Sequence, residues 1–179
     1  RETPAIPGMA VNHREIPHPT LTDRLRMVVP VSLPSVGLTA LAVRPQPRPV
    51  SHLGSLSPAP GVLDNGLIRI EVGLGGALIL TDLRTDQVYA NLLTLEDTGD
   101  VGDGWTYRAP LEDEAATTVA SGCTVTLETD GPLQATLRID YTGFLVPRSA
   151  VRGGRGRSDE RIALPVTTRI TLRRDQAFA

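Results

Sequence analysis

Strict alternation of apolar and polar side chains is the feature that most constrains the fold of this 179-residue chain. In residues 67–72, the apolar Ile68, Ile70 and Val72 are separated by single charged residues. Successive side chains of a β-strand point to opposite faces, so this pattern predicts a strand with one buried and one solvated face. The same alternation recurs in three further segments, 119–129, 135–141 and 166–173.

Turn residues separate these segments and complete the expected sheets. Residues 73–76 include three glycines, and residues 130–132 read Asp-Gly-Pro, so both segments favour tight turns. Two more strands are expected at 77–81 and 87–93. No segment has a sustained helical period, and two sheets packed face to face bury every apolar row. We therefore predict an all-β fold, an antiparallel β-sandwich.

Proline-rich sequence divides the chain before the sandwich. Residues 45–60 contain five prolines, which favours an extended linker. We assign residues 1–44 to an N-terminal segment with two short strands, at 25–33 and 36–43. Residues 61–179 are assigned to the β-sandwich domain.

Charge and hydropathy argue against several classes of partner. The chain has 18 basic and 20 acidic residues and a formal net charge of -2, which argues against nucleic acid or an anionic membrane surface. No apolar stretch is long enough to cross a bilayer, and no signal peptide is visible. Because the first residue is Arg1 and not methionine, the chain is compatible with a piece of a longer protein. The compartment is left open, with a bacterial-type cytoplasmic location favoured.

Isolated cysteine and histidine residues give no sign of a disulfide or a zinc site. Cys123 is the only cysteine, and its place in an alternating segment favours a small buried apolar role. His13, His18 and His52 match neither a helical ligand pair nor a zinc finger, so we expect solvated loop side chains.

The segment 95–110 gathers acidic and aromatic residues in one loop. Three aspartates, Asp97, Asp100 and Asp103, precede Trp105. Carboxylates accept hydrogen bonds from sugar hydroxyls, and a ring face covers the apolar C–H patch of a sugar. This composition predicts a sugar contact made by Trp105, Asp100 and Asp103. We expect Tyr107 to pack beneath the loop.

Three other interpretations of this loop stay open. The aspartates suit calcium by residue type, but their spacing does not match an EF-hand. A pair of carboxylates is also the machinery of glycoside hydrolysis, although the glycines on either side of Asp103 favour a flexible loop over a rigid catalytic pair. In the third interpretation the Gly-Asp pairs only form turns, and the tryptophan belongs to the core.

Residues 147–161 form an unusual connection, with five arginines and three glycines between two expected strands. The segment is too polar to be a strand, and its plain interpretation is a mobile solvated loop. The alternative is a lid or a contact between subunits of a homo-oligomer, which directs arginines toward an acidic partner. The arginines considered for this role are Arg148, Arg152, Arg155 and Arg157.

Two long motifs resemble a known family. The string VLDNGLIRIEV, followed by LTDLRTDQVYANLLTLEDTGDVGDGWTYRAP, resembles the start of the C-terminal β region of family 38 glycoside hydrolases, the retaining α-mannosidases. The likeness covers about residues 25–175, and its most specific part is the loop from Glu96 to Pro110. A tyrosine of the family's loop corresponds in position to Trp105, whose indole also offers a ring face but lacks the phenolic hydroxyl. The family's turn glycine is replaced by Asp86.

This resemblance implies a β-sandwich of the galactose-mutarotase-like or supersandwich type, incomplete at its C-terminus. In the family, a separate N-terminal domain carries the nucleophile, the acid and the zinc ligands. We therefore expect no catalytic residue, no metal ligand and no cofactor in this chain. The expected partners are an N-terminal catalytic domain of the same protein, which holds zinc, and an α-mannoside. The alternatives are a stand-alone carbohydrate-binding module and a structural or oligomerisation domain.

Overall fold

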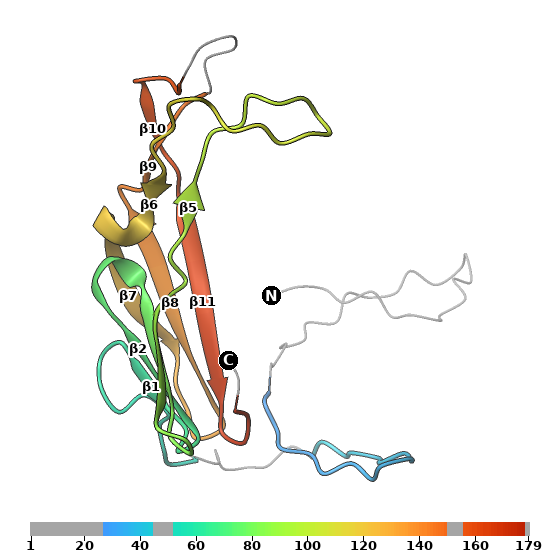
Figure 1. The fold of residues 1–179 in the computed structure, drawn as a ribbon. Helices are drawn as coiled ribbons and strands as arrows, with labels where there is room; N and C mark the ends of the chain where they lie inside the picture. Colours follow the sequence, from blue (N-terminus) through green and yellow to red (C-terminus); the bar gives the residue numbers. More distant parts are fainter. Residues whose placement is uncertain (1–26, 45–51, 150–155, 178–179) are drawn as a thin grey trace, which may run out of the picture. The chain divides into compact units, whose positions relative to one another are not determined.

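The computed structural model describes residues 27–44, 52–149 and 156–177, and its described secondary structure consists of β-strands and two short 3₁₀ turns (Figure 1). The predicted all-β class is confirmed. The chain divides into two units, residues 1–38 and residues 39–179. All the strands in the described ranges belong to the second unit.

Two antiparallel sheets make up most of the second unit. The first sheet has the order β1-β2-β3-β4, and the second has the order β11-β8-β7. The strands of the first sheet are β1 (Val62–Asp64), β2 (Ile68–Val72), β3 (Leu78–Asp82) and β4 (Gln87–Leu92). Those of the second sheet are β7 (Gly122–Thr129), β8 (Gln134–Thr142) and β11 (Val166–Arg173).

Two small ladders and two 3₁₀ turns complete the unit. The ladders pair β5 (Glu96–Asp97) with β6 (Ala116–Thr117), and β9 (Leu145–Pro147) with β10 (Arg161–Ala163). The turns are η1 (Leu74–Gly76) and η2 (Thr118–Ala120). The second turn occupies the first residues of the strand predicted at 119–129, so β7 begins later than expected.

The apolar rows predicted for β2, β8 and β11 meet in one core, as expected for a sandwich. The row predicted within 119–129 is only partly buried, and its Leu127 is exposed. The core cluster contains Leu63, Ile68, Ile70 and Leu78 of the first sheet, which join Ala135, Leu137, Ile139, Tyr141, Ile170 and Leu172 of the second sheet. Burying one aliphatic side chain of this size contributes about 1.5–3 kcal/mol. Cys123 is partly buried and packs against this core, which agrees with an apolar role.

Tyr141 shows how closely the turn η1 approaches the second sheet. Its ring is 4% exposed, and its hydroxyl donates a 3.3 Å hydrogen bond to the main-chain oxygen of Gly76. A Cβ atom at Gly76 would lie 2.7 Å from the ring, and the residue has a φ of +78°. Burial raises the pKa of the Tyr141 hydroxyl. Glycine is therefore required here both by space and by backbone conformation.

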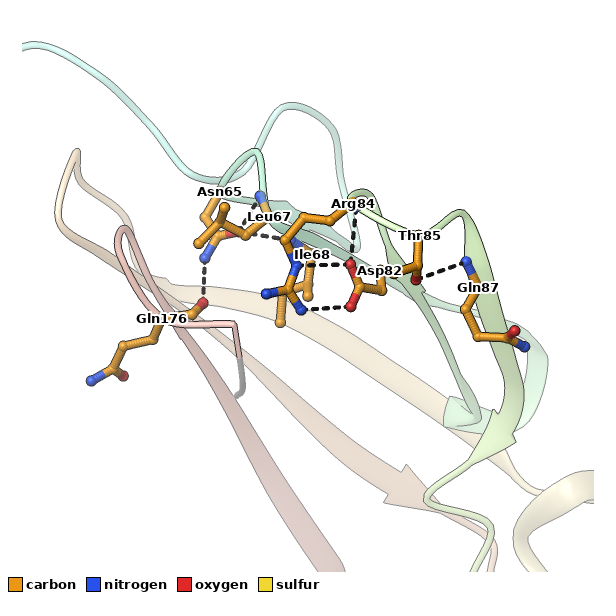
Figure 2. Close-up of polar contacts among 8 residues, drawn as sticks. All are labelled: Asn65, Leu67, Ile68, Asp82, Arg84, Thr85, Gln87 and Gln176. Carbon is orange, nitrogen blue, oxygen red and sulfur yellow. Dashed lines mark hydrogen bonds and ion pairs between the residues drawn. The ribbon is translucent and has the colours of Figure 1, made fainter.

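Side-chain hydrogen bonds hold the turns at one end of the first sheet (Figure 2). The Oδ1 atom of Asn65 accepts from the main-chain nitrogens of Leu67 and Ile68, at 2.9 Å each. In the next turn, the guanidinium of Arg84 donates to both oxygens of Asp82, at 3.0 and 2.6 Å. Asp86 has a φ of +56°, a conformation in which glycine is less strained than aspartate.

The strands expected in the N-terminal segment are not found in its described residues. Neither strand predicted within 25–33 and 36–43 forms over residues 27–44, whose side chains are exposed. A strand needs a partner edge for its backbone groups, and no residue in 27–44 has a ladder partner in the described part of the chain. The expectation of strands is wrong for these residues. The assigned boundaries at 44 and 60 stay predictions.

The described end of the expected linker also takes part in the sandwich. Leu56 is 7% exposed and belongs to the core cluster. Its main-chain oxygen accepts from the nitrogen of Asp64 at 2.8 Å, and that of Ala59 accepts from Val62 at 3.1 Å. Proline removes a donor but leaves neighbouring carbonyls able to accept, which is why a proline-rich segment pairs here.

Candidate functional site

The acidic and aromatic loop lies between β5 and β6, and it projects from the sheets as a long hairpin (Figure 1). Its ends are joined by a two-residue antiparallel ladder, in which Glu96 pairs with Thr117 and Asp97 with Ala116. Directly beyond this ladder, the main chain of Leu95 exchanges hydrogen bonds with the buried Thr118. The loop is therefore closed at its base.

Asp100 closes the tip of the loop. Its Oδ1 atom accepts hydrogen bonds from the main-chain nitrogens of Gly102 at 2.8 Å and Arg108 at 3.0 Å. The main-chain nitrogen of Val101 donates to the oxygen of Arg108 at 2.8 Å. The hydrogen bond from Arg108 is the main cause that lowers the pKa of Asp100, and the bond from Gly102 lowers it further. The carboxylate is thus an ionised acceptor that joins the two arms of the tip.

Asp103 forms a second turn, directly before the tryptophan. Its Oδ1 atom accepts from the main-chain nitrogens of Trp105 at 2.9 Å and Thr106 at 2.8 Å. The hydrogen bond from Trp105 is the main cause that lowers the pKa of the Asp103 carboxyl, and the bond from Thr106 lowers it further. The turn-forming interpretation is therefore correct for one oxygen of each aspartate. It does not exclude sugar contact, because a carboxylate oxygen accepts more than one hydrogen bond.

The two aromatic side chains of the loop face solvent. Trp105 is 98% exposed, so the interpretation that placed it in the core is wrong. Tyr107 is 62% exposed, and the expectation that it packs beneath the loop is wrong as well. The loop leaves the sandwich as a hairpin, so no layer of the second unit lies beneath its tip (Figure 1).

Glycine is needed at one position of the tip and is dispensable at a neighbouring one. A Cβ atom at Gly102 would lie 1.8 Å from the main-chain oxygen of Thr106, whereas a Cβ atom at Gly104 would meet nothing within 4 Å. The arms of the tip are therefore in close contact at Gly102. Of the two glycines beside Asp103, only Gly102 is closely packed.

The arginine-rich segment reaches this loop through Arg157. The side chain of Arg157 is 8% exposed and forms ion pairs with the carboxylates of Asp97 and Asp113. Arg148 behaves differently, since it is exposed and pairs with Glu160 at 2.7 Å. Arg152 and Arg155 lie outside the described residues. Arg157 is therefore not a solvated side chain, and its acidic partners belong to the same chain.

No metal centre is found in the part of the chain that the structure describes. Among residues 27–44, 52–149 and 156–177, no three His, Cys, Asp or Glu side chains gather as a metal ion would require. The aspartates at the tip are used in separate turns, which does not favour the calcium interpretation. His52 is exposed, and His13 and His18 lie outside the described residues. The same part of the chain contains no helix long and apolar enough to span a membrane.

Comparison with solved structures relates this fold to glycoside hydrolases. The chain is similar to an alpha-mannosidase from Enterococcus faecalis V583, with a TM-score of 0.65, 25% sequence identity, and a match covering 70% of this chain and 16% of that chain. It is also similar to a protein of glycosyl hydrolase family 38 from Enterococcus faecalis, with a TM-score of 0.65, 24% identity, and coverage of 72% and 17%. No protein-family model matches the chain, and no curated protein does.

These matches confirm the resemblance predicted from the sequence. The chain contains a domain related in structure to family 38 glycoside hydrolases, and the match spans about one sixth of the length of those proteins. The activity of a whole hydrolase does not follow from so small a share of its length.

Proposed function

We propose that this chain is the non-catalytic β-sandwich portion of a retaining α-mannosidase-like glycoside hydrolase, which supports the catalytic domain and lends its loop to the sugar site. The observation that carries the proposal is the position of Trp105, fully exposed at the tip of a tightly folded loop. An exposed indole leaves its ring face open to another surface, and covering that face with apolar atoms is favourable. The similarity to an alpha-mannosidase indicates the kind of surface.

The chemistry of the tip suits a sugar. Trp105 offers an open ring face for the apolar side of a hexose, and the ionised carboxylates of Asp100 and Asp103 accept hydroxyl hydrogen bonds. Indole lacks the phenolic hydroxyl of the tyrosine that the family resemblance places here. Contact through the ring face is therefore expected to contribute more than a directed hydrogen bond at this position.

Bond cleavage is assigned to the partner domain in this proposal. Retaining hydrolysis needs a nucleophilic carboxylate and an acid on opposite sides of the glycosidic bond, and the loop aspartates are occupied in separate turns. In this proposal zinc also belongs to the partner domain, as the family resemblance implies. The role of this chain is to position a ring and two acceptors.

An activity assay tests this division of labour. The 179-residue chain and the complete gene product that contains it are each assayed with an aryl α-mannoside in the presence of zinc. We expect turnover by the complete protein alone. In the complete protein, Trp105→Ala is expected to raise the KM about 10-fold, as loss of a stacking contact would, while Val88→Ala, on the exposed β4, serves as the control. Turnover by the 179-residue chain alone would contradict the proposal.

A binding measurement separates this function from that of a free-standing carbohydrate-binding module. The exposed ring favours the module as the second candidate. Trp105 is the only tryptophan, so tryptophan fluorescence, excited selectively over that of tyrosine, reports on this loop alone. A binding module shows a saturable change in emission when mannose or short mannosides are added to the 179-residue chain. A loop that only completes a neighbouring site is expected to show none.

A further inference from the structure

We propose that Arg157 is a positioning residue, which holds the base of the loop between β5 and β6 and so sets the direction of Trp105. The effect of Arg157 on a sugar rests on the proposed function, whereas its effect on the loop does not. The inference begins from a contrast between two arginines of one segment. Arg157 is buried, whereas Arg148 is exposed.

The guanidinium of Arg157 holds the first arm of the loop at two points. Its Nη1 atom donates to the main-chain oxygen of Asp97 at 3.0 Å, and its Nη2 atom pairs with the carboxylate of the same residue. A planar guanidinium that binds a main-chain oxygen and a carboxylate together restricts both position and orientation. Asp97 is the last residue of β5, so these two contacts lie where the loop begins.

The same side chain also reaches the second arm. Nη1 lies 3.7 Å from Oδ1 of Asp113, while Oδ2 of Asp113 accepts from the main-chain nitrogen of Gly99 at 2.7 Å. A Cβ atom at Gly99 would meet Cδ of Arg157 at 3.0 Å and the ring of Pro110 at 2.7 Å. The stem of Arg157 and the proline ring thus pack on the backbone of Gly99. One side chain from a distant segment thereby joins both arms.

The contacts within the tip explain why the base controls the direction of the ring. The hydrogen bonds made by Asp100 and Asp103 all end within the loop itself. They make the tip rigid without attaching it to the sandwich. The ladder of β5 and β6 is two residues long, too short to fix an angle on its own. The contacts of Arg157 supply the missing constraint.

The chemistry of the ion pair favours orientation over stability as its contribution. A buried ion pair is often no more stabilising than apolar residues of the same volume, because both charges lose their hydration. The Nε atom of Arg157 is buried and has no hydrogen-bond partner in the part of the chain that the structure describes. An apolar side chain would fill this space without an unpaired donor, but it would not direct the backbone at Asp97.

Hydrogen exchange of single amides in the 179-residue chain tests the inference. In Arg157→Gln, we expect the amide of Gly99 at the base to exchange about 10-fold faster or more, because its acceptor Asp113 loses its partner. The amides of Gly102 and Trp105 should keep their rates, because their acceptors lie within the tip. Arg148→Gln, the matched control, should leave all three rates unchanged.

Further variants guard against a general loss of folding. If Arg157→Gln also accelerates exchange in β8, the same amides are measured in Arg157→Lys and Asp113→Asn. Lysine keeps the positive charge but lacks the planar guanidinium that contacts two acceptors at once. We therefore expect the amide of Gly99 in Arg157→Lys to exchange at a rate between those of the unaltered chain and Arg157→Gln. Asparagine at position 113 keeps an acceptor for Gly99 but removes the ion pair, and faster exchange there is expected. Unchanged exchange at Gly99 in all of these variants would overturn the inference.

Kinetics of the complete gene product then distinguish this inference from the proposed function. Arg157→Gln is expected to raise the KM for the mannoside about 5-fold and to leave kcat nearly unchanged, because the ring is displaced while the reacting groups are not. Faster exchange at the base with an unchanged KM supports Arg157 as a positioning residue and counts against sugar contact by the loop. A changed KM without faster exchange at the base overturns the inference.

Discussion

The side-chain amide of Asn65 donates a 2.7 Å hydrogen bond to the main-chain oxygen of Gln176, although the two residues are 111 positions apart in the chain (Figure 2). The same Nδ2 atom donates to the main-chain oxygen of Arg173, at the end of β11, also at 2.7 Å. Asn65 therefore links the turn between β1 and β2 to the far end of the second sheet. Both oxygens accept from the same amide nitrogen.

Replacing Asn65 with aspartate is expected to lower the free energy of unfolding by about 2 kcal/mol or more, because a carboxylate would face two carbonyl oxygens. Aspartate keeps the acceptor for the nitrogens of Leu67 and Ile68, so the local turn survives and only the long-range link is lost. Urea denaturation measures the difference. The control is Gln176→Ala, which keeps the main-chain oxygen and should change the free energy by no more than about 0.5 kcal/mol. Equal losses in the two variants would contradict this role of Asn65.

Two glycines with nearly the same φ separate the effect of crowding from that of backbone strain. Gly76 and Gly66 have φ values of +78° and +80°, but only at Gly76 would a Cβ atom meet the ring of Tyr141. Gly66→Ala should cost about 1 kcal/mol from backbone strain. Gly76→Ala should cost at least about 1–3 kcal/mol more, because the ring must move within a packed core. Thermal or urea unfolding of both variants checks the difference. Similar losses of stability would show that the ring of Tyr141 moves aside at little cost.

The two glycines of the loop tip give a local version of the same test. Gly102→Ala is expected to open the tip, because its Cβ atom would overlap the main-chain oxygen of Thr106. The fluorescence anisotropy of Trp105 should fall, while the thermal midpoint of the sandwich stays close to that of the unaltered chain. Gly104→Ala has free space around it and should leave the anisotropy unchanged. A similar fall in anisotropy in both variants would mean that the close contact at Gly102 does not hold the tip.

Acid should loosen the tip of the loop. Main-chain hydrogen bonds lower the pKa of Asp100 and Asp103 below the ordinary value of 3.8, so their contribution to the ordered loop is complete above that pH. It is lost as the pH falls through the lowered values, because a protonated carboxyl is a weaker acceptor. We expect the anisotropy of Trp105 to fall in this range. In Asp100→Ala combined with Asp103→Ala, the anisotropy should be low already at neutral pH, and a pH-dependent fall in this variant would refute the assignment.

Asp82 should make the first sheet sensitive to acid in a defined range. The side-chain hydrogen bond from Arg84 is the main cause that lowers the pKa of Asp82 from 3.8 to about 2 (Figure 2). Because the folded value is the lower one, the stabilisation is complete above pH 3.8 and is lost as the pH falls toward about 2. The thermal midpoint of the unaltered chain should exceed that of Asp82→Asn at neutral pH. The two midpoints should converge across this range, and a difference that persists in acid would argue against the ion pair.

Local patterns predicted most of the sandwich correctly. The alternating rows identified β2, β8 and β11 nearly residue by residue, and the turn residues placed the chain reversals between β2 and β3 and between β7 and β8. This succeeds because a half-buried strand records its two faces in neighbouring residues. The expectation failed for 27–44, where β-branched content suggested strands but no partner edge is present in the described part of the chain. The composition of a segment does not show whether another strand lies beside it to pair with.

The loop shows the same division on a smaller scale. The sequence suggested an exposed acidic and aromatic loop, and the turn-forming property of Gly-Asp pairs was visible in it. The exposure of Tyr107 was missed, because it depends on the hairpin extending beyond both sheets. Arg157 was named only as one of four arginines that a lid or subunit contact would direct toward an acidic partner, and its burial against Asp97 and Asp113 of the same chain was not foreseen. The acidic Asp97, at the end of β5, was the sequence signal for an arginine partner.

The sequence by itself determined the class of this protein: an antiparallel sandwich with one acidic and aromatic loop, similar to a region of family 38 glycoside hydrolases. These properties are local, because strand faces, turns and motifs are written in consecutive residues. Only the tertiary structure decided which arginine is buried against Asp97, and which asparagine joins the two sheets. Those contacts span 60 and 111 positions, and a contact at such separation leaves no periodic trace in either segment.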